Sequence, residues 1–228
     1  MCGRFALFAP PGQLVEYFDL AEPPTEALEP HYNVTPGRRV AAVRVRRDGG
    51  RRLDLLHWGL VPFWAKDRRI GYKLVNARLE TLADKPAFRE ALARRRCLIP
   101  ASGFYEWADG EPPGKRKRQP FFARTADEPL LAFAGLWERW RGPDGAPLES
   151  CTIVTTAAHG VLAPIHDRMP VAVVRADFAT WLDPTTGLAA LAALAARGPS
   201  FEAWPVGPAV NDPRNDDDRL MAPLEKTA

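Results

Sequence analysis

The chain has 228 residues, of which 46% are hydrophobic and 26% charged, a balance ordinary for a globular protein with a substantial core. No apolar run reaches membrane-spanning length and no signal peptide opens the chain, so we expect a cytoplasmic protein that does not bind membranes. Three cysteines without metal-ligand or disulfide-framework spacing favour a reducing compartment, and the net charge of +3, clustered along the chain, is compatible with a polyanionic partner.

In chain order, apolar spacing first predicts a helix over residues 13–20 and an acidic, proline-rich loop over 21–30. Strands are predicted at 40–45 and 53–58, joined by a turn at 48–50. Asp84 is a candidate N-cap for a helix over 86–96, because its side chain could accept hydrogen bonds from free backbone amides and Pro86 suits a first turn.

The middle of the chain is rich in strand signals. Aromatic and β-branched runs predict strands at 97–99, 104–107, 121–124, 130–137 and 151–156, with the basic segment 110–118 as an exposed hairpin loop. Helices at 176–182 and 186–197 and a strand at 201–206 follow, before a polar tail from about residue 212. This order predicts a single α+β domain over residues 1–228, β-rich, with a mainly antiparallel sheet or open barrel and flanking helices.

The first residues of the chain offer an unusual nucleophile. Methionine aminopeptidases remove Met1 before a small residue, so we expect Cys2 to become the N-terminus. Its α-amine and thiol, with reference pKa values of about 7.7–8.0 and about 8.5, then share one carbon and are both partly nucleophilic near neutral pH. An aldehyde would form an imine with the amine, and the thiol would close on that imine to give a thiazolidine. The alternative is a cysteine that only packs as a small apolar residue.

Two aromatic and polar segments suggest a nucleic-acid surface. Residues 58–64 place Phe63 and Trp64 on a loop with proline and glycine, where aromatic faces could stack on bases. Residues 76–80 add Asn76, which could orient a polar substrate, and Arg78, which could reach a phosphate. The alternative is a surface loop whose aromatic rings fold back onto the core. A third segment, 32–37, is better explained as a turn.

Two further residues are candidates for proton transfer. Glu106 lies among aromatic residues on a predicted strand, where desolvation disfavours the charged carboxylate. His166 lies in the segment 165–170, a polar motif between apolar residues, where Asp167 and Arg168 would tune an imidazole that titrates near physiological pH. The alternatives are an ion pair between Glu106 and an arginine, and a structural loop histidine. The four histidines lack metal-ligand spacing, so we expect no metal site.

Taken together, these segments resemble the SOS-response-associated peptidase (SRAP) family of abasic-site processing proteins. Six motifs occur in the family's order: Met1-Cys2-Gly3-Arg4-Phe5, Tyr32-Asn33-Val34-Thr35-Pro36-Gly37, Trp58-Gly59-Leu60-Val61-Pro62, Asn76-Ala77-Arg78, Gly103-Phe104-Tyr105-Glu106-Trp107 and His166-Asp167-Arg168-Met169-Pro170. The resemblance implies a DNA repair protein that binds single-stranded DNA and captures the aldehyde of an abasic site as a covalent thiazolidine crosslink. Strand cleavage of the AP-lyase type and self-removal of Met1 are further activities that it implies.

The resemblance also implies residue roles. Cys2 carries over as the nucleophile, and Asn76, Glu106 and His166 as its active-site partners. DNA-contacting positions of the family correspond to Arg4, Pro36, Trp64, Arg78, Thr155 and Arg168, to which the stacking argument adds Phe63. Two departures, Ala65 where some members carry Trp and Gly207 where Ser is common, bear on individual DNA contacts but not on the chemistry.

We expect no cofactor, because an aldehyde is already an electrophile. The expected partner is single-stranded DNA with abasic sites, bound by a monomer in the nucleoid, with replication-fork proteins as candidate protein partners. Two rival functions remain open. The Met-Cys-Gly start also fits an N-terminal-nucleophile glutaminase, in which Cys2 attacks an amide. A non-catalytic single-strand-binding module would leave Cys2 incidental.

Overall fold

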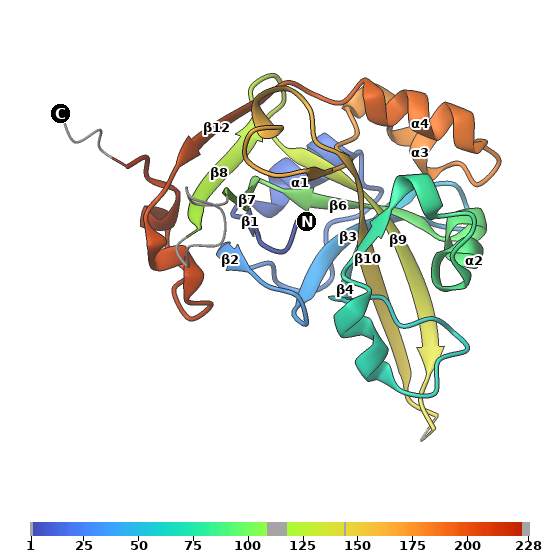
Figure 1. Ribbon diagram of the computed structural model, residues 1–228. Helices are drawn as coiled ribbons and strands as arrows, with labels where there is room; N and C mark the ends of the chain where they lie inside the picture. The colour runs from blue at the N-terminus through green and yellow to red at the C-terminus, as the bar shows by residue number, and fades with distance from the viewer. Residues whose placement is uncertain (1, 109–117, 144, 225–228) are drawn as a thin grey trace.

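The computed structural model describes residues 2–108, 118–143 and 145–224, which form a mixed α+β fold as the sequence predicts (Figure 1). The first sheet has the strand order β12-β8-β7-β1-β2, and all its neighbouring strands are antiparallel. Its strands are β1 (Phe5–Leu7), β2 (His31–Val34), β7 (Gly103–Ala108), β8 (Gln119–Thr125) and β12 (Phe201–Pro205). The short strand β1 lies between β2 and β7, so the start of the chain is held inside the sheet.

The second sheet closes on itself. Its ring consists of β3 (Arg39–Val45), β4 (Arg51–Trp58), β6 (Arg96–Ala101), β9 (Leu131–Arg141) and β10 (Pro147–Ala157). The ring closes because β9 pairs with both β6 and β10, while β10 also pairs with β4. The predicted open barrel is therefore closed. The short strands β5 (Asn76–Arg78) and β11 (Arg168–Pro170) extend from β10, which runs parallel to β4 and β5.

Period-two alternation in β3 divides the core into two clusters. Val40 and Ala42 point into a cluster that joins the two sheets, whereas Ala41 and Val43 point toward the helices. The helices are α1 (Pro11–Phe18), α2 (Pro86–Arg94), α3 (Phe178–Leu182) and α4 (Leu188–Ala196). Cys2 belongs to the cluster between the sheets, so the predicted nucleophile lies in their seam.

Several predicted boundaries differ in the structure. Helix α2 begins at Pro86 as expected, but Lys85 occupies the N-cap and no side chain caps the helix, so the prediction for Asp84 is wrong. The predicted hairpin loop at 110–118 lies outside the described residues except for its last residue. No helix among the described residues combines the length and apolarity needed to cross a bilayer.

The polar tail predicted from about residue 212 is a packed segment in the structure. Residues 207–224 return across the first sheet and contain two 3₁₀ turns, η5 (Pro208–Asn211) and η6 (Asp218–Met221). Val210 and Leu220 are buried in a third apolar cluster with Tyr105 and Phe122. Polar composition concealed this packing, because two well-placed apolar side chains suffice to anchor so short a segment.

Candidate active site

The polypeptide around Cys2 is fixed by main-chain contacts on both sides. Phe5 pairs with Val34 of β2 and with Phe104 of β7, and the backbone amide of Tyr105 donates to the carbonyl of Arg4 over 2.9 Å. The Cys2 side chain is fully buried, and its thiol is free. The start of the chain is therefore a rigid interior feature (Figure 1).

Asn76 contacts Cys2 directly. It begins β5, where it pairs with Ile153 of β10, and its Nδ2 donates to the Cys2 carbonyl oxygen over 2.8 Å. Its Oδ1 is buried and has no hydrogen-bond partner among the described residues. An unsatisfied buried acceptor typically costs about 1–3 kcal/mol. Asn76 therefore offers a ready acceptor beside the residue whose α-amine the removal of Met1 would free.

The ionisation of Glu106 is shifted by burial, and Glu106 in turn shifts that of Cys2. Burial raises the pKa of the Glu106 carboxyl to about 7, and the nearby Asp167 adds to this rise. Burial also raises the pKa of the Cys2 thiol well above its usual range, and the negative charge of Glu106 raises it further. The thiol is therefore protonated at neutral pH, while Glu106 titrates there and can both accept and donate a proton.

His166 lies between η3 (Gly160–Leu162) and β11, and its protonation follows from its contacts. The backbone N–H of Arg168 donates to Nδ1 over 2.9 Å, while Asp167 Oδ1 lies 2.7 Å from the same nitrogen. These contacts require opposite states of Nδ1, since an acceptor nitrogen carries no proton. The backbone contact is fixed by the chain, whereas the Asp167 side chain is 80% exposed. Nδ1 therefore accepts from Arg168 when it carries no proton and donates to Asp167 when it carries one.

Glu106 and His166 line a cleft of about 470 Å³. It is lined by Gly3, Arg4, Arg78, Glu106, Trp107, Arg118, His166, Asp167 and Arg168. The cleft thus brings together five of the predicted site residues and adds a fourth arginine, Arg118. Cys2 directly precedes Gly3, which is one of the lining residues. Four guanidinium groups make this a cleft suited to phosphates. A larger hollow of about 770 Å³, near Phe8 and Arg124, contains none of the predicted residues.

Arg168 is anchored before any ligand arrives. Its guanidinium makes two 2.9 Å hydrogen bonds to the Glu80 carboxylate and one of 2.8 Å to the Thr155 carbonyl oxygen. Thr155 is fully buried, and its hydroxyl lies 3.4 Å from the Ala77 carbonyl oxygen. The Thr155 side chain therefore supports Arg168 and β5 and does not line the cleft.

The predicted stacking residues lie outside the cleft lining. Phe63 and Trp64 are 55% and 48% exposed on the loop that follows β4. At the start of this loop Gly59, at φ +130°, packs closely against the backbone of Gly71. The approach is so close that a Cβ on Gly59 would lie only 2.9 Å from the Gly71 carbonyl oxygen. The exposed rings are therefore presented by a fixed loop.

Sequence reasoning missed one exposed aromatic residue nearby. Tyr72, in η1 (Arg68–Lys73), is 71% exposed, and its ring lies 3.9 Å from where a Cβ on Gly37 would stand. It therefore flanks the turn that contains Pro36. The sequence shows a tyrosine in a basic segment, 68–73, but nothing in the local pattern distinguishes an exposed tyrosine from one that folds back onto the core.

Comparison with known proteins identifies the family. Residues 1–213 match the SOS response associated peptidase (SRAP) family. The chain is 40% identical over 225 residues to "Abasic site processing protein YoqW" of Bacillus subtilis (strain 168), covering 97% of this chain and 99% of that protein. It is 31% identical over 202 residues to "Abasic site processing protein HMCES" of Mus musculus, covering 75% of this chain and 56% of that protein.

Solved structures share the fold. A protein from Bacteroides thetaiotaomicron superposes with a TM-score of 0.85 at 23% identity, covering 98% of this chain and 100% of that chain. A phage-related protein from Bordetella bronchiseptica superposes with a TM-score of 0.71 at 30% identity, covering 90% of this chain and 94% of that chain. The chain belongs to the SOS response associated peptidase (SRAP) family.

Proposed function

We propose that this protein processes abasic sites in single-stranded DNA by forming a thiazolidine crosslink through Cys2. The relatives named as abasic site processing proteins support the substrate class. The observation that carries the chemistry is the grouping around the chain's start: Asn76 bonded to Cys2, and Glu106 with a pKa of about 7 in electrostatic contact with it. The arginine-lined cleft that Glu106 shares supports a phosphate-bearing substrate.

The first step needs the α-amine of Cys2, which the removal of Met1 exposes. An ionised Glu106 accepts one proton from the ammonium group, and the neutral amine adds to C1′ of the ring-opened sugar to give a carbinolamine. Asn76 Oδ1 accepts a hydrogen bond from the amine and orients its lone pair toward the aldehyde. Protonated Glu106 then returns the proton to the carbinolamine hydroxyl, which leaves as water, so that a protonated imine forms and Glu106 is ionised again.

The second step closes the ring. Glu106, ionised again after the loss of water, takes the proton of the Cys2 thiol as sulfur bonds to C1′ of the protonated imine, and the C=N electron pair ends on nitrogen to give a neutral amine. Aldehyde and cysteine thus give thiazolidine and one water, with no net change in oxidation state. The raised pKa of the thiol fits this order, since a thiol that stays protonated leaves the first attack to the amine.

His166 serves the sugar rather than the cysteine. In the imidazolium form, in which Nδ1–H donates to Asp167, Nε2–H is suited to protonate the ring oxygen O4′ as the C1′–O4′ bond breaks and the C1′ hydroxyl loses its proton to water. The neutral ring that keeps its proton on Nδ1, toward Asp167, leaves Nε2 able to remove a C2′ proton and expel the 3′ phosphate, which is the AP-lyase reaction. Its position in the cleft with Glu106 supports both roles.

DNA binding combines phosphate contacts and stacking. Arg78 and Arg4 reach phosphates from the cleft, and Arg168 contributes from its anchored position, with Thr155 acting through it. Phe63, Trp64 and Pro36 extend the track outside the cleft, where exposed rings stack on unpaired bases. Single strands exposed at replication forks are the setting that such a surface suits.

Intact-mass analysis tests this function. The purified mature protein is mixed with an abasic single-stranded oligonucleotide, and the adduct is digested and sequenced by mass. We expect protein plus oligonucleotide minus one water, with the added mass on the peptide that begins at Cys2. Glutamine hydrolysis without a covalent adduct would favour a glutaminase. Binding to the oligonucleotide without a covalent adduct would favour a non-catalytic binding module.

A further inference from the structure

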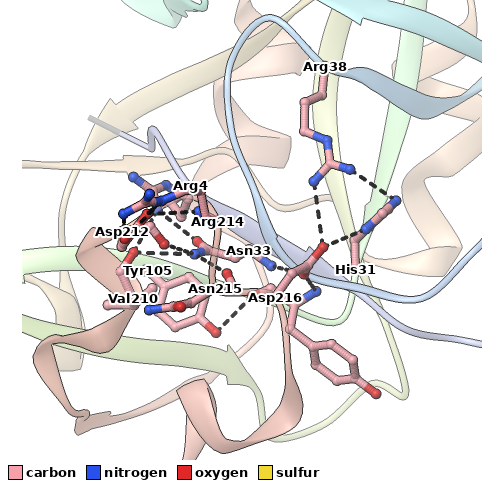
Figure 2. A network of polar contacts seen from close by, with 11 residues as sticks. Arg4, His31, Asn33, Arg38, Tyr105, Val210, Asp212, Arg214, Asn215 and Asp216 are labelled. Atoms are coloured by element: carbon pink, nitrogen blue, oxygen red, sulfur yellow. Dashed lines mark hydrogen bonds and ion pairs between the residues drawn. The ribbon is translucent and has the colours of Figure 1, made fainter.

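A segment from the far end of the chain reaches the candidate active site. This segment, residues 207–221, is termed the C-terminal strap, and Figure 2 shows its polar contacts. Asp216 fastens it to β2, because its Oδ1 accepts hydrogen bonds from the backbone amides of Tyr32 and Asn33 over 2.5 and 2.9 Å. Its Oδ2 lies 2.7 Å from His31 Nδ1. The strap is therefore held along the length of β2.

Asn33 joins the strap to Arg4. Its side chain is fully buried, and its Nδ2 lies 2.7 to 3.3 Å from three strap carbonyl oxygens, those of Val210, Asp212 and Asn215. Its Oδ1 accepts a 2.7 Å hydrogen bond from Arg4 Nη1. The amide orientation follows from these partners, since a flipped amide would set donors against the guanidinium and an oxygen against the carbonyls. An aspartate at position 33 would lack the N–H donors to the strap carbonyls, and an alanine would lack both these donors and the acceptor for Arg4.

Arg4 is consequently held along one edge. Its Nη1 also donates to the Val210 carbonyl oxygen over 2.7 Å, and its guanidinium lies 5.7 Å from the centroid of the Trp107 ring. Trp107 in turn donates to Asn211 Oδ1 of the strap over 2.7 Å. Arg4 lines the cleft, and its backbone amide contacts the Cys2 sulfur. The strap thus reaches the nucleophile through one arginine.

We infer that Asn33, fastened by the C-terminal strap, is a positioning residue that preorganises Arg4 for a DNA phosphate next to the abasic sugar. This inference rests on the proposed function. A free arginine side chain populates many rotamers, and ordering them opposes phosphate binding. Asn33 reduces this entropic cost before DNA binds, because it fixes Nη1 of the guanidinium. The sequence 32–37, which alone reads as a turn, therefore contributes to the site through Asn33.

A double-mutant cycle tests the coupling. Wild type, Asn33→Ala, Arg4→Ala and the double variant are compared for affinity to a single strand with a stable tetrahydrofuran abasic analogue, and for the crosslinking rate at low concentrations of natural abasic DNA. We expect Asn33→Ala to weaken binding and slow crosslinking by about tenfold in the wild-type background and by less than about twofold when Arg4 is already absent. Equal losses in both backgrounds would overturn the positioning role.

Two further variants separate positioning from folding. Asn33→Asp keeps an acceptor for Arg4 but loses the donors to the strap, so we expect a lower unfolding midpoint with affinity and salt slope close to wild type. Affinity as poor as that of Asn33→Ala would assign the effect to the strap alone and overturn the inference. Arg214→Ala is the matched control, because Arg214 is an exposed strap residue paired with Asp212. We expect it to behave as wild type.

Two outcomes need separate treatment. If Asn33→Ala does not fold, Asn33→Ser replaces it in the cycle, because serine can still donate one hydrogen bond but is one bond shorter toward Arg4. If the wild-type protein neither binds nor crosslinks abasic DNA, the proposed function fails and the inference fails with it. If the wild type reacts but the losses caused by the Asn33 and Arg4 substitutions simply add, only the role of Asn33 is overturned.

Discussion

The side-chain amide of Asn76 donates a 2.8 Å hydrogen bond to the carbonyl oxygen of Cys2, so the first peptide unit of the mature chain is fixed from a strand of the other sheet. The same amide keeps its buried oxygen without a partner among the described residues. This pair links the fold to the chemistry, because closure of the barrel places β5 beside the start of β1.

Substitution of Asn76 should therefore impair reaction more than binding. Asn76→Asp keeps the side-chain shape but puts a carboxylate oxygen against the Cys2 carbonyl, which loses the hydrogen bond and misplaces the amine. Misplacement of a reacting group by about 1 Å can cost about 10²-fold in rate. We expect crosslinking to slow by about 10- to 100-fold at saturating DNA, with little change in affinity for a stable abasic analogue. A wild-type rate in single-turnover assays would refute this role.

Glu106 should control the rate and its pH dependence. Glu106→Gln removes the proton-transfer group while preserving size, and general acid–base catalysis typically contributes about 10²–10⁴-fold. In the wild type, the rate of imine formation should rise with pH through about 7, as Glu106 ionises and can accept the ammonium proton. The measurement is the crosslinking rate between pH 5 and 9. An inflection near 7 that persists in Glu106→Gln would assign it to another group.

Glu106 should also make the protein less stable as pH rises. Its pKa is raised in the folded state relative to an unfolded value near 4.5, so the folded state binds more protons between these two values. The free energy of unfolding should therefore fall from about pH 4.5 to about pH 7, by at most about 3 kcal/mol. Glu106→Gln should flatten this part of the profile and be the more stable protein at pH 8. The measurement is urea denaturation of both proteins across this pH range. If the free energy of unfolding of Glu106→Gln depends on pH in the same way as that of the wild type, the assignment is contradicted.

Arg78 should contribute to binding through charge alone. Loss of one phosphate contact lowers the slope of log affinity against log salt by about 0.7 for a single strand. Arg78→Ala should therefore weaken binding to all oligonucleotide sequences alike and reduce the slope by about that amount. Arg94→Ala is a suitable control, because Arg94 is exposed on α2 and pairs with Glu90. Equal slopes for the two variants would count against the placement of Arg78.

Features that depend on local sequence pattern and side-chain chemistry could be predicted from the sequence. Alternating residues in β3 and β4 predicted a hairpin that the structure confirms, and aromatic neighbours around Glu106 predicted the burial that raises its pKa. Both features depend on residues a few positions apart, where strand geometry relates sequence directly to space. The helix signal at Pro86 succeeded for the same reason, and the helix predicted over 13–20 is present at Pro11–Phe18.

Contacts between distant segments were harder to predict. Asn33 reads locally as a turn residue, yet it is buried because the strap covers it from almost 180 positions further along the chain. Thr155 was expected at DNA, and its burial follows from the pairing of β10 with β5 and β11 on either side. Closure of the barrel likewise depends on β9 pairing with two strands at once, which no single window of sequence encodes.

The central claim, that the free amine and thiol of Cys2 act together, is tested most directly by a non-removable residue added before Cys2. The extended protein keeps the thiol but converts the amine into an amide, which cannot form an imine. Its matched control carries the same extension after Ala228. Intact-mass analysis with abasic single-stranded DNA should show binding without a covalent adduct for the first protein and a durable adduct for the second. A durable adduct on the intact, N-terminally extended protein would contradict the mechanism.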